Sequence, residues 1–382
     1  MKIWAPNYVT FGTGKWHNER SAFKAAFQYG TNVFLGGMSD HFNTACRDLC
    51  PGGVLSEPRL KGFSTDVFAG SAIDFLNEYA SGSRENPFFC YVSFTALHDP
   101  YSPREDYIDM YRPDALPLPG NFMLLHPFEF DSRQIIIRDE NLSPWPRTAE
   151  ITRAILADYY ALITHMDDKI GEIIQVLKDR EMYDNTIIVF SSDNDMAVGS
   201  HGLLGKQNLY EHSTKVPLII KGPGIPEGEV FDALVYLFDV YPTLAELCGL
   251  GAPENIDGLS LALIIRGQSD AVRSSLFTAY RHTARAIRTG TWKLIRYPEI
   301  DYSQLFNLVN DPLELNNLAG DLAYQDKYNE LMQLMRQWQV AANDTAPLTA
   351  DVIRPLEYDH TQFIRKPDRH QPAYMLEKYF GD

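Results

Sequence analysis

The residues of this chain that could perform chemistry are concentrated between two apolar runs near its middle. The sequence SSDND occupies positions 191–195, and the glycine-rich segment that follows carries His201 and Lys206. Carboxylate and amide oxygens, of the kind that Asp193 and Asn194 supply, are the ligands that hard divalent cations prefer. Lysine and histidine can stabilise an oxyanion. The sequence therefore predicts a joint site for a metal ion and an anionic group.

Buried strands are the elements best suited to position these residues. The runs Ile187–Phe190 and Val216–Ile220 are short and rich in β-branched and aromatic residues, which predicts strands rather than helices. In open α/β sheets ligands bind beyond the carboxyl ends of the strands, where SSDND would lie. The same rule applies to His98, which follows the apolar run Phe88–Phe94. We therefore favour a ligand-binding role for His98 over that of a capped loop histidine.

A third set of polar residues lies near the N-terminus, in the sequence Thr13-Gly14-Lys15-Trp16-His17. A short motif of this kind has a high false-positive rate, and a surface turn is the alternative interpretation. Periodic apolar patterns predict helices from about Thr65 and over 151–180, and strands that alternate with helices form a largely parallel sheet. Its carboxyl edge would bring Lys15 and His17 close to His98 and SSDND.

The pattern divides the chain into two parts. Residues 1–266 are predicted to form an α/β domain, and residues 274–382 a smaller subdomain with an antiparallel sheet, one helix and a tail. The sheet is indicated by short turn-separated strands from Ser275 onward, and the helix by the periodic segment Tyr324–Val340. The proline-bearing segment 101–150 has little periodicity, so we expect it to shape substrate choice.

Composition narrows the classes of function. The chain has 382 residues and a net charge of −16, which argues against general nucleic-acid binding. It contains no apolar run of the length that a transmembrane helix requires. Four cysteines are too few for a disulfide scaffold. Cys46 and Cys50, near His41, allow a zinc site as an alternative, although no second Cys/His pair stands at finger spacing.

Several phrases resemble one family. The stretch GSHGLLGKQNLYEHSTKVPLIIKGPG at 199–224, with SSDN before it, is similar to type I sulfatases of the alkaline-phosphatase-like superfamily. GKWH at 14–17, SFTALHDPYSP at 93–103 and LFNLVNDPLELNNLA at 305–319 are similar to further family signatures. The resemblance implies an alkaline-phosphatase-like α/β fold and hydrolysis of sulfate esters. It also implies a small-molecule or oligosaccharide substrate, with a sulfated carbohydrate expected, and a periplasmic or secreted location.

The resemblance also implies roles for individual residues. Asp193 and Asn194 would bind a divalent metal, usually Ca²⁺. Sulfate oxygens would be held by Lys15, His98 and Lys206, and His17 would hydrogen-bond the nucleophile. The family commonly has glycine where Asp195 stands, so this position is a departure.

The family nucleophile is a formylglycine made from cysteine or serine in the motif C/S-x-P/A-x-R. None of the four cysteines fits this motif, and Ser56-Glu57-Pro58-Arg59 is one residue short. The family's opening strand, with its metal-binding aspartate pair, is not recognised either. We therefore expect a chain that begins partway through the fold and is inactive alone. We also expect weak metal binding, because Ca²⁺ takes about six to eight oxygen ligands.

Two alternatives remain open. The superfamily also hydrolyses phosphoesters and phosphonates with similar ligands. A non-catalytic protein that binds sulfated ligands through Lys15, His98 and Lys206 is the other alternative.

Overall fold

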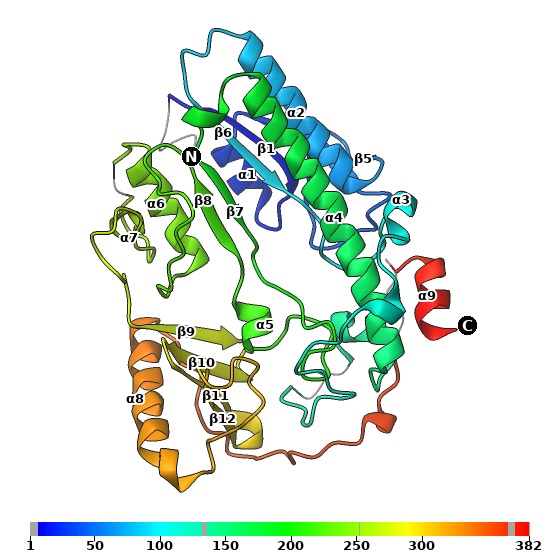
Figure 1. The fold of residues 1–382 in the computed structure, drawn as a ribbon, viewed down its shortest axis with the longest axis vertical. Helices are drawn as coiled ribbons and strands as arrows, with labels where there is room; N and C mark the ends of the chain where they lie inside the picture. Colours follow the sequence, from blue (N-terminus) through cyan, green and yellow to red (C-terminus); the bar gives the residue numbers. More distant parts are fainter. Residues whose placement is uncertain (1–6, 132–135, 252, 366–370, 382) are drawn as a thin grey trace.

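A mixed sheet forms the centre of the N-terminal part. The computed structural model describes residues 7–131, 136–251, 253–365 and 371–381. Strands β1, β2 and β6 are parallel, with β1 in the middle, and β3, β4 and β5 extend the β2 side in antiparallel fashion. Figure 1 shows β1 and β6 side by side. Their bounds are β1 (Val9–Lys15), β2 (Tyr29–Phe34), β3 (Ala45–Cys50), β4 (Val54–Leu55), β5 (Arg59–Leu60) and β6 (Phe88–Ser93).

This architecture confirms the predicted α/β class and adds one detail. The sheet is mixed rather than largely parallel, because residues 38–65 contain the antiparallel strands β3, β4 and β5. These strands lack an apolar run because most of their residues stay partly exposed.

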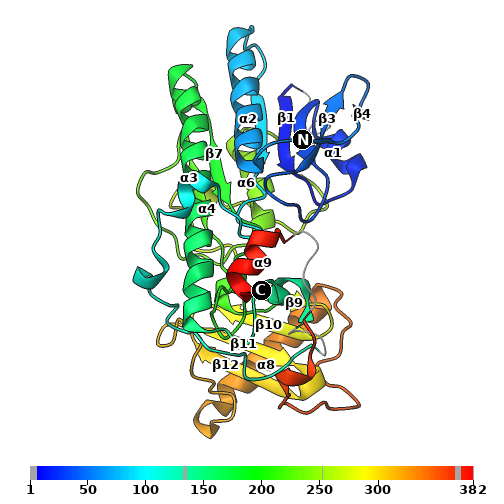
Figure 2. The same cartoon turned by 90° about the vertical axis from the view of Figure 1, so that its right-hand side faces the viewer.

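Helices cover both faces of the parallel strands. On one face α2 (Ser64–Ser81) and α4 (Ala149–Asp179) lie side by side (Figures 1 and 2). Phe11 of β1 is buried there against Phe75 and Leu76. On the other face α1 (Arg20–Ala26) buries Phe23 in a cluster with Phe27, which follows the helix, and Val33 of β2. Burial of these apolar side chains is what holds the strand ends in place.

A separate pair of strands, β7 (Ile188–Ser191) and β8 (Leu218–Lys221), is antiparallel. The start of β7 packs in the same apolar cluster as the start of β6, through Ile188 and Phe88. Among the described residues, however, β6 pairs only with β1 and β7 only with β8. The segments expected to be fully buried strands are therefore only half-buried, and Phe190 is 36% exposed.

The C-terminal part is a four-stranded antiparallel sheet with α8 (Gln325–Ala341) on one face. Its other face packs on the loop that carries Lys206, through Tyr210, Ile295 and Tyr297. This confirms the predicted antiparallel subdomain with its helix, whereas the boundary between 266 and 274 stays a prediction. The strands are β9 (Ser275–Tyr280), β10 (Ala284–Thr289), β11 (Trp292–Tyr297) and β12 (Tyr302–Asn307).

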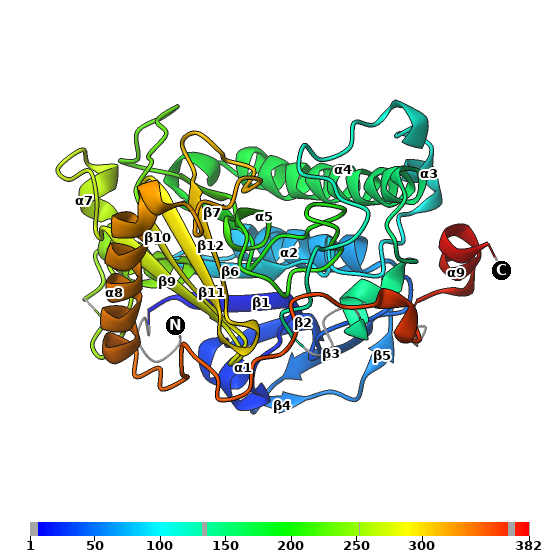
Figure 3. The ribbon, with the colours of Figure 1, turned by 90° about the horizontal axis from the view of Figure 1, so that it is seen from below.

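The tail runs back from the C-terminal sheet to the α/β part, as Figure 3 shows. Arg354 donates to the Phe130 carbonyl, Tyr358 to that of His126 and Gln371 to that of Leu142. It ends in α9 (Ala373–Phe380), which packs on α4. The other elements are α3 (Glu105–Ile108), α5 (Glu211–Thr214), α6 (Val240–Leu247), α7 (Ala262–Ile265) and the 3₁₀ turns η1 (Pro113–Ala115), η3 (Arg138–Leu142), η4 (Tyr183–Asn185), η5 (Leu237–Asp239), η6 (Pro298–Ile300), η7 (Leu322–Tyr324) and η8 (His360–Gln362). Among the described helices, none has the length and apolar character needed to cross a membrane.

Candidate functional site

The carboxyl ends of β1 and β6 meet because Gly14 has no side chain. Its φ is +90°, and a Cβ built there would lie 2.0 Å from the Ser93 carbonyl oxygen. Only glycine tolerates this left-handed backbone at such close approach. As a result Lys15, the last residue of β1, lies beside the segment that follows β6 and carries His98.

Electrostatic coupling shows that the predicted residues come together. Burial lowers the pKa of Lys15, and the charge of Lys206 lowers it further. The carboxylates of Asp193 and Asp99 act on Lys15 in the opposite direction. Burial also lowers the pKa of His17, with further contributions from Lys15, His98 and Lys206. Four segments that are far apart in the sequence thus form one cluster, which we call the Lys15 cluster: Lys15, His17, His98, Asp193 and Lys206.

The two lysines of this cluster lack a direct partner among the described residues. Both side chains are half-buried, and neither ammonium has a hydrogen bond or ion pair to a residue that the structure describes. The charge of Lys206 lowers the pKa of Lys15 although Asp193 and Asp99 act against it, and an anion between the two ammonium groups would reduce this repulsion. The arrangement therefore suits an anionic ligand.

The two histidines of the cluster have defined surroundings. His98 Nδ1 lies 3.0 Å from the Asp99 carbonyl oxygen and 3.1 Å from Asp99 Oδ1. Because both partners can only accept, Nδ1 must carry the proton, and Nε2 is left for a ligand. The ring of His17 lies against Gly37, where a Cβ would come within 2.8 Å of His17 Cε1.

The predicted metal ligands follow β7. Asp193 is exposed and Asn194 is half-buried. Asp195, the departure noted in the sequence, is held through one of its carboxylate oxygens. Its Oδ1 accepts hydrogen bonds from the Tyr159 hydroxyl, at 3.2 Å, and from the Met196 amide.

These residues do not by themselves meet the requirements of Ca²⁺. Asp193 and Asn194 offer one carboxylate and one amide, far from the coordination that Ca²⁺ prefers. In the part of the chain that the structure describes, no group of three or more His, Cys, Asp or Glu side chains could hold a metal. Calcium therefore stays a prediction, and no chemical step is assigned to it.

His201 is not part of the cluster, although it shares the glycine-rich segment with Lys206. Its Nε2 lies 3.1 Å from the Glu314 carbonyl oxygen, and its ring stacks on Tyr210 at a centroid distance of 4.0 Å. The residue is buried and fixes the loop to the C-terminal sheet. The sequence pattern could not distinguish this structural role from a ligand role.

Two residues next to the cluster were missed by the sequence interpretation. Asp99 is 1% exposed and binds His98, and Arg138 lies 3.3 Å from Asp99 Oδ1 through its Nη2. Arg138 opens the turn η3 in the long segment without periodicity, so no pattern singled it out. Asp99 follows His98 directly, and that adjacency was the one available signal.

None of the cysteines lies in the Lys15 cluster. Cys46 is buried beside Phe34 and Phe68, and its burial raises the pKa of the thiol to about 12. Burial likewise raises the pKa of Cys90 to about 12. Cys50 ends β3, Cys248 is exposed, and all four thiols are free. A thiol with such a raised pKa is a poor nucleophile at neutral pH.

The sequence interpretation overlooked one literal match to the nucleophile motif, the stretch Ser269–Arg273. It follows α7, where Val272 packs in the cluster that covers β8. Ser269 Oγ donates to the Ala271 carbonyl at 2.8 Å, and Arg273 pairs with the buried Asp239. These contacts give Ser269–Arg273 a structural role, and none of them involves the Lys15 cluster.

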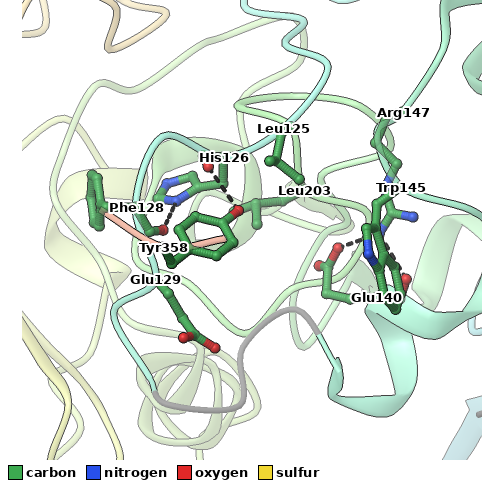
Figure 4. Close-up of a pocket in the computed structure, with 10 residues that line it drawn as sticks. Leu125, His126, Phe128, Glu129, Glu140, Trp145, Arg147, Leu203 and Tyr358 are labelled. Carbon is green, nitrogen blue, oxygen red and sulfur yellow. Dashed lines mark hydrogen bonds and ion pairs between the residues drawn. The ribbon is translucent and has the colours of Figure 1, made fainter. Parts of the chain in front are cut away.

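A small cavity lies beneath the loop that carries Lys206 (Figure 4). Its volume of about 10 Å³ has room for about one water molecule. Glu140 forms one wall, paired with Arg147 at 2.6 Å, and its carboxylate accepts from the amides of Leu204 and Gly205. The cavity therefore belongs to the support of the loop rather than to a ligand site.

Comparison with known proteins gives consistent results over most of the chain. A family model described as Sulfatase matches residues 5–250, and one described as N-sulphoglucosamine sulphohydrolase, C-terminal, matches residues 199–341. A choline-sulfatase of Rhizobium meliloti is 37% identical over 318 residues, covering 78% of this chain and 61% of the relative. An N-acetylglucosamine-6-O-sulfatase of Bacteroides thetaiotaomicron is 26% identical over 355 residues, covering 75% and 63%.

A solved structure described as a complex with its substrate D-glucosamine-2-N,6-O-disulfate has the same fold. Its TM-score is 0.72 at 22% identity, and the match covers 91% of this chain and 82% of that chain. The chain spans about three fifths of the length of the two curated relatives.

Proposed function

The chain belongs to the sulfatase family, and on this premise we propose that its Lys15 cluster binds the sulfate group of a sulfate ester for hydrolysis. One observation carries the proposal. The half-buried ammonium groups of Lys15 and Lys206 lie close enough for Lys206 to lower the pKa of Lys15, with no described partner for either. An anion bound between them would relieve their repulsion. A sulfate ester carries the required negative charge.

The chemistry of the ester accounts for the rest of the cluster. As the S–O bond breaks, negative charge develops on the leaving oxygen, and fixed cations stabilise it. With Nδ1–H held by Asp99, His98 can carry a second proton on Nε2 in its imidazolium form and pass that proton to the leaving oxygen. Burial lowers the pKa of His17, which favours the neutral imidazole and suits a residue that orients a nucleophile. We assign no nucleophilic step, because the cluster contains no cysteine or serine.

For the substrate we propose a sulfated small molecule or carbohydrate. The two curated relatives act on choline sulfate and on a sulfated N-acetylglucosamine, as their names state, and the structural neighbour was solved with a sulfated glucosamine. We further propose that the segment 101–150, which reaches the cluster through Arg138, selects among such substrates.

Titration calorimetry with inorganic sulfate and with 4-nitrophenyl sulfate tests the proposal. Wild-type protein should bind both, and Lys206→Gln should bind each about tenfold more weakly, the loss expected for one charged contact. Lys24→Gln, which changes an exposed lysine of α1, is the matched control and should bind like wild type. Equal affinities for wild type and Lys206→Gln would rule out the proposed site.

A further inference from the structure

A continuous set of hydrogen bonds joins His98 to the segment of Lys206, and it passes through Arg138. Asp99 Oδ1 lies 3.1 Å from His98 Nδ1 and 3.3 Å from Arg138 Nη2. The same guanidinium reaches Asp139 Oδ1 through Nη2 at 2.5 Å and through Nε at 2.9 Å. Asp139 Oδ2 then accepts from Gln207 Nε2 at 2.7 Å. We call this set, Asp99–Arg138–Asp139–Gln207, the Arg138 bridge.

At one end the bridge fixes the protonation of a ligand-binding residue. Asp99 is the side-chain acceptor for His98 Nδ1, so its charge favours the tautomer that leaves Nε2 toward the ligand. Burial raises the pKa of Asp99. This effect is outweighed by the hydrogen bond with His98 and by the charges of His98, Arg138 and Lys206, so the pKa lies below its ordinary value. The carboxylate therefore stays charged although it is 1% exposed.

At the other end the bridge fixes the backbone of the Lys206 loop. Gln207 Oε1 accepts from the amide of Lys206 at 3.2 Å, while its amide group binds Asp139. The next residue of the turn, Glu140, accepts from the amides of Leu204 and Gly205. The turn that begins with Arg138 thus holds the loop on both sides of Lys206.

A guanidinium suits this position better than another cation would. It is planar and presents several donors in fixed directions, so it can bind two carboxylates at once, which an ammonium does less well. Without it, two buried carboxylates, Asp99 and Asp139, would face each other with less compensation. Removing one partner of such a buried ionic group is costly, because the other is left uncompensated.

We propose that Arg138 is a positioning residue, which sets the tautomer of His98 and the place of Lys206 through the carboxylates of Asp99 and Asp139. The effect on sulfate binding rests on the proposed function, whereas the effect on His98 does not. Arg138 belongs to the segment 101–150. This segment would therefore position the ligand-binding side chains in addition to selecting the substrate.

The test combines a spectroscopic signature with a binding constant. In ¹⁵N-histidine-labelled protein at pH 8, long-range ¹H–¹⁵N spectra report which ring nitrogen of His98 carries the proton. Wild type should show a protonated Nδ1. Arg138→Gln should lose part of that signal and bind inorganic sulfate about tenfold more weakly, and Arg138→Lys should recover part of both. The matched control is Arg112→Gln, which removes an exposed Arg–Asp pair of the same segment and should leave both readouts unchanged.

The outcomes separate this inference from the proposed function. His98 signals unchanged in Arg138→Gln, with a sulfate Kd within about twofold of wild type, overturn the inference. If Arg138→Gln loses the Nδ1 proton but even the wild-type protein binds no sulfate, the inference is supported and the proposed function is wrong. If Arg138→Gln does not fold, Asp99→Asn provides the same test, because it removes the charge that His98 and Arg138 share and keeps one oxygen. Unchanged His98 signals and an unchanged sulfate Kd in Asp99→Asn would also overturn the inference.

Discussion

At the scale of single residues, Lys15 is held in the fold at a cost to stability. Its pKa is lowered by burial and then by Lys206, so the unfolded chain binds the Lys15 proton more tightly than the folded chain does. Below the lowered pKa the folded state therefore carries the full penalty of the charged side chain. Binding and active sites commonly contain residues of this kind, which lower the stability of the fold but are needed for activity.

We accordingly expect Lys15→Met to be more stable than wild type while losing sulfate binding. The melting temperature at pH 7 should rise by on the order of 1–3 °C, because a change of about 1 kcal/mol moves the transition of a large domain by a few degrees. Lys24→Met, at an exposed position, should change neither quantity. A lower melting temperature for Lys15→Met would show that Lys15 stabilises the fold instead.

The residues of the candidate site were largely predictable where they follow apolar runs. His98 lies in the loop that follows β6 and Asp193 in the loop that follows β7, and parallel strands bring such residues to one edge. Arg138 was not predictable, because its turn has neither periodicity nor a strand before it. His201 was grouped with Lys206 by sequence proximity, but the loop turns it toward the C-terminal sheet.

At the scale of elements, α9 gives the tail a role that its polar sequence did not reveal. Lys378 Nζ lies 2.7 Å from Asp158 Oδ1 of α4, and the Tyr379 hydroxyl donates to Asp158 Oδ2 at 2.6 Å. Burial raises the pKa of the Asp158 carboxyl, although Lys378 and Tyr379 act against the rise. The tail therefore closes onto the helix that supports Asp195, through Tyr159.

Lys378→Met should destabilise the protein in a pH-dependent way. Without Lys378 the pKa of Asp158 in the folded state rises further above its value in the unfolded state. The charged carboxylate then destabilises the folded state fully above the folded-state pKa, and this loss of stability disappears as the pH falls through that pKa. We expect a loss of about 1–3 kcal/mol in urea unfolding at pH 7, and a loss that becomes smaller as the pH is lowered. Lys327→Met, which breaks the exposed pair with Glu330 on α8, should show neither. A loss independent of pH would contradict this account.

At the scale of the whole molecule, the described strands leave the sheet open between β6 and β7. The carboxyl ends of both strands face the Lys15 cluster, and their starts share one apolar cluster, so they run in the same direction. Neither bonds to the other in the part of the chain that the structure describes. The sequence predicted both strands, whereas the order of the strands in the sheet is given only by the structure.

This chain should bind sulfate without hydrolysing sulfate esters. We expect the 382-residue protein to release no 4-nitrophenol from 4-nitrophenyl sulfate above background, because no cysteine stands in the nucleophile motif or in the cluster. A spectrophotometric assay over hours measures this. Turnover that is lost in Lys206→Gln would falsify the expectation, and its loss in Ser269→Ala would identify Ser269 as the nucleophile.

The central claim is that Lys15 and Lys206 form one anion site, and the pKa of Lys15 tests it most directly. Titration of the lysine side-chain NMR signals, with and without inorganic sulfate, gives this value. We predict a Lys15 pKa below the ordinary 10.5 in the free protein, because of burial and of Lys206, and a rise when sulfate is added. A Lys15 pKa at its ordinary value that sulfate does not change would contradict the account.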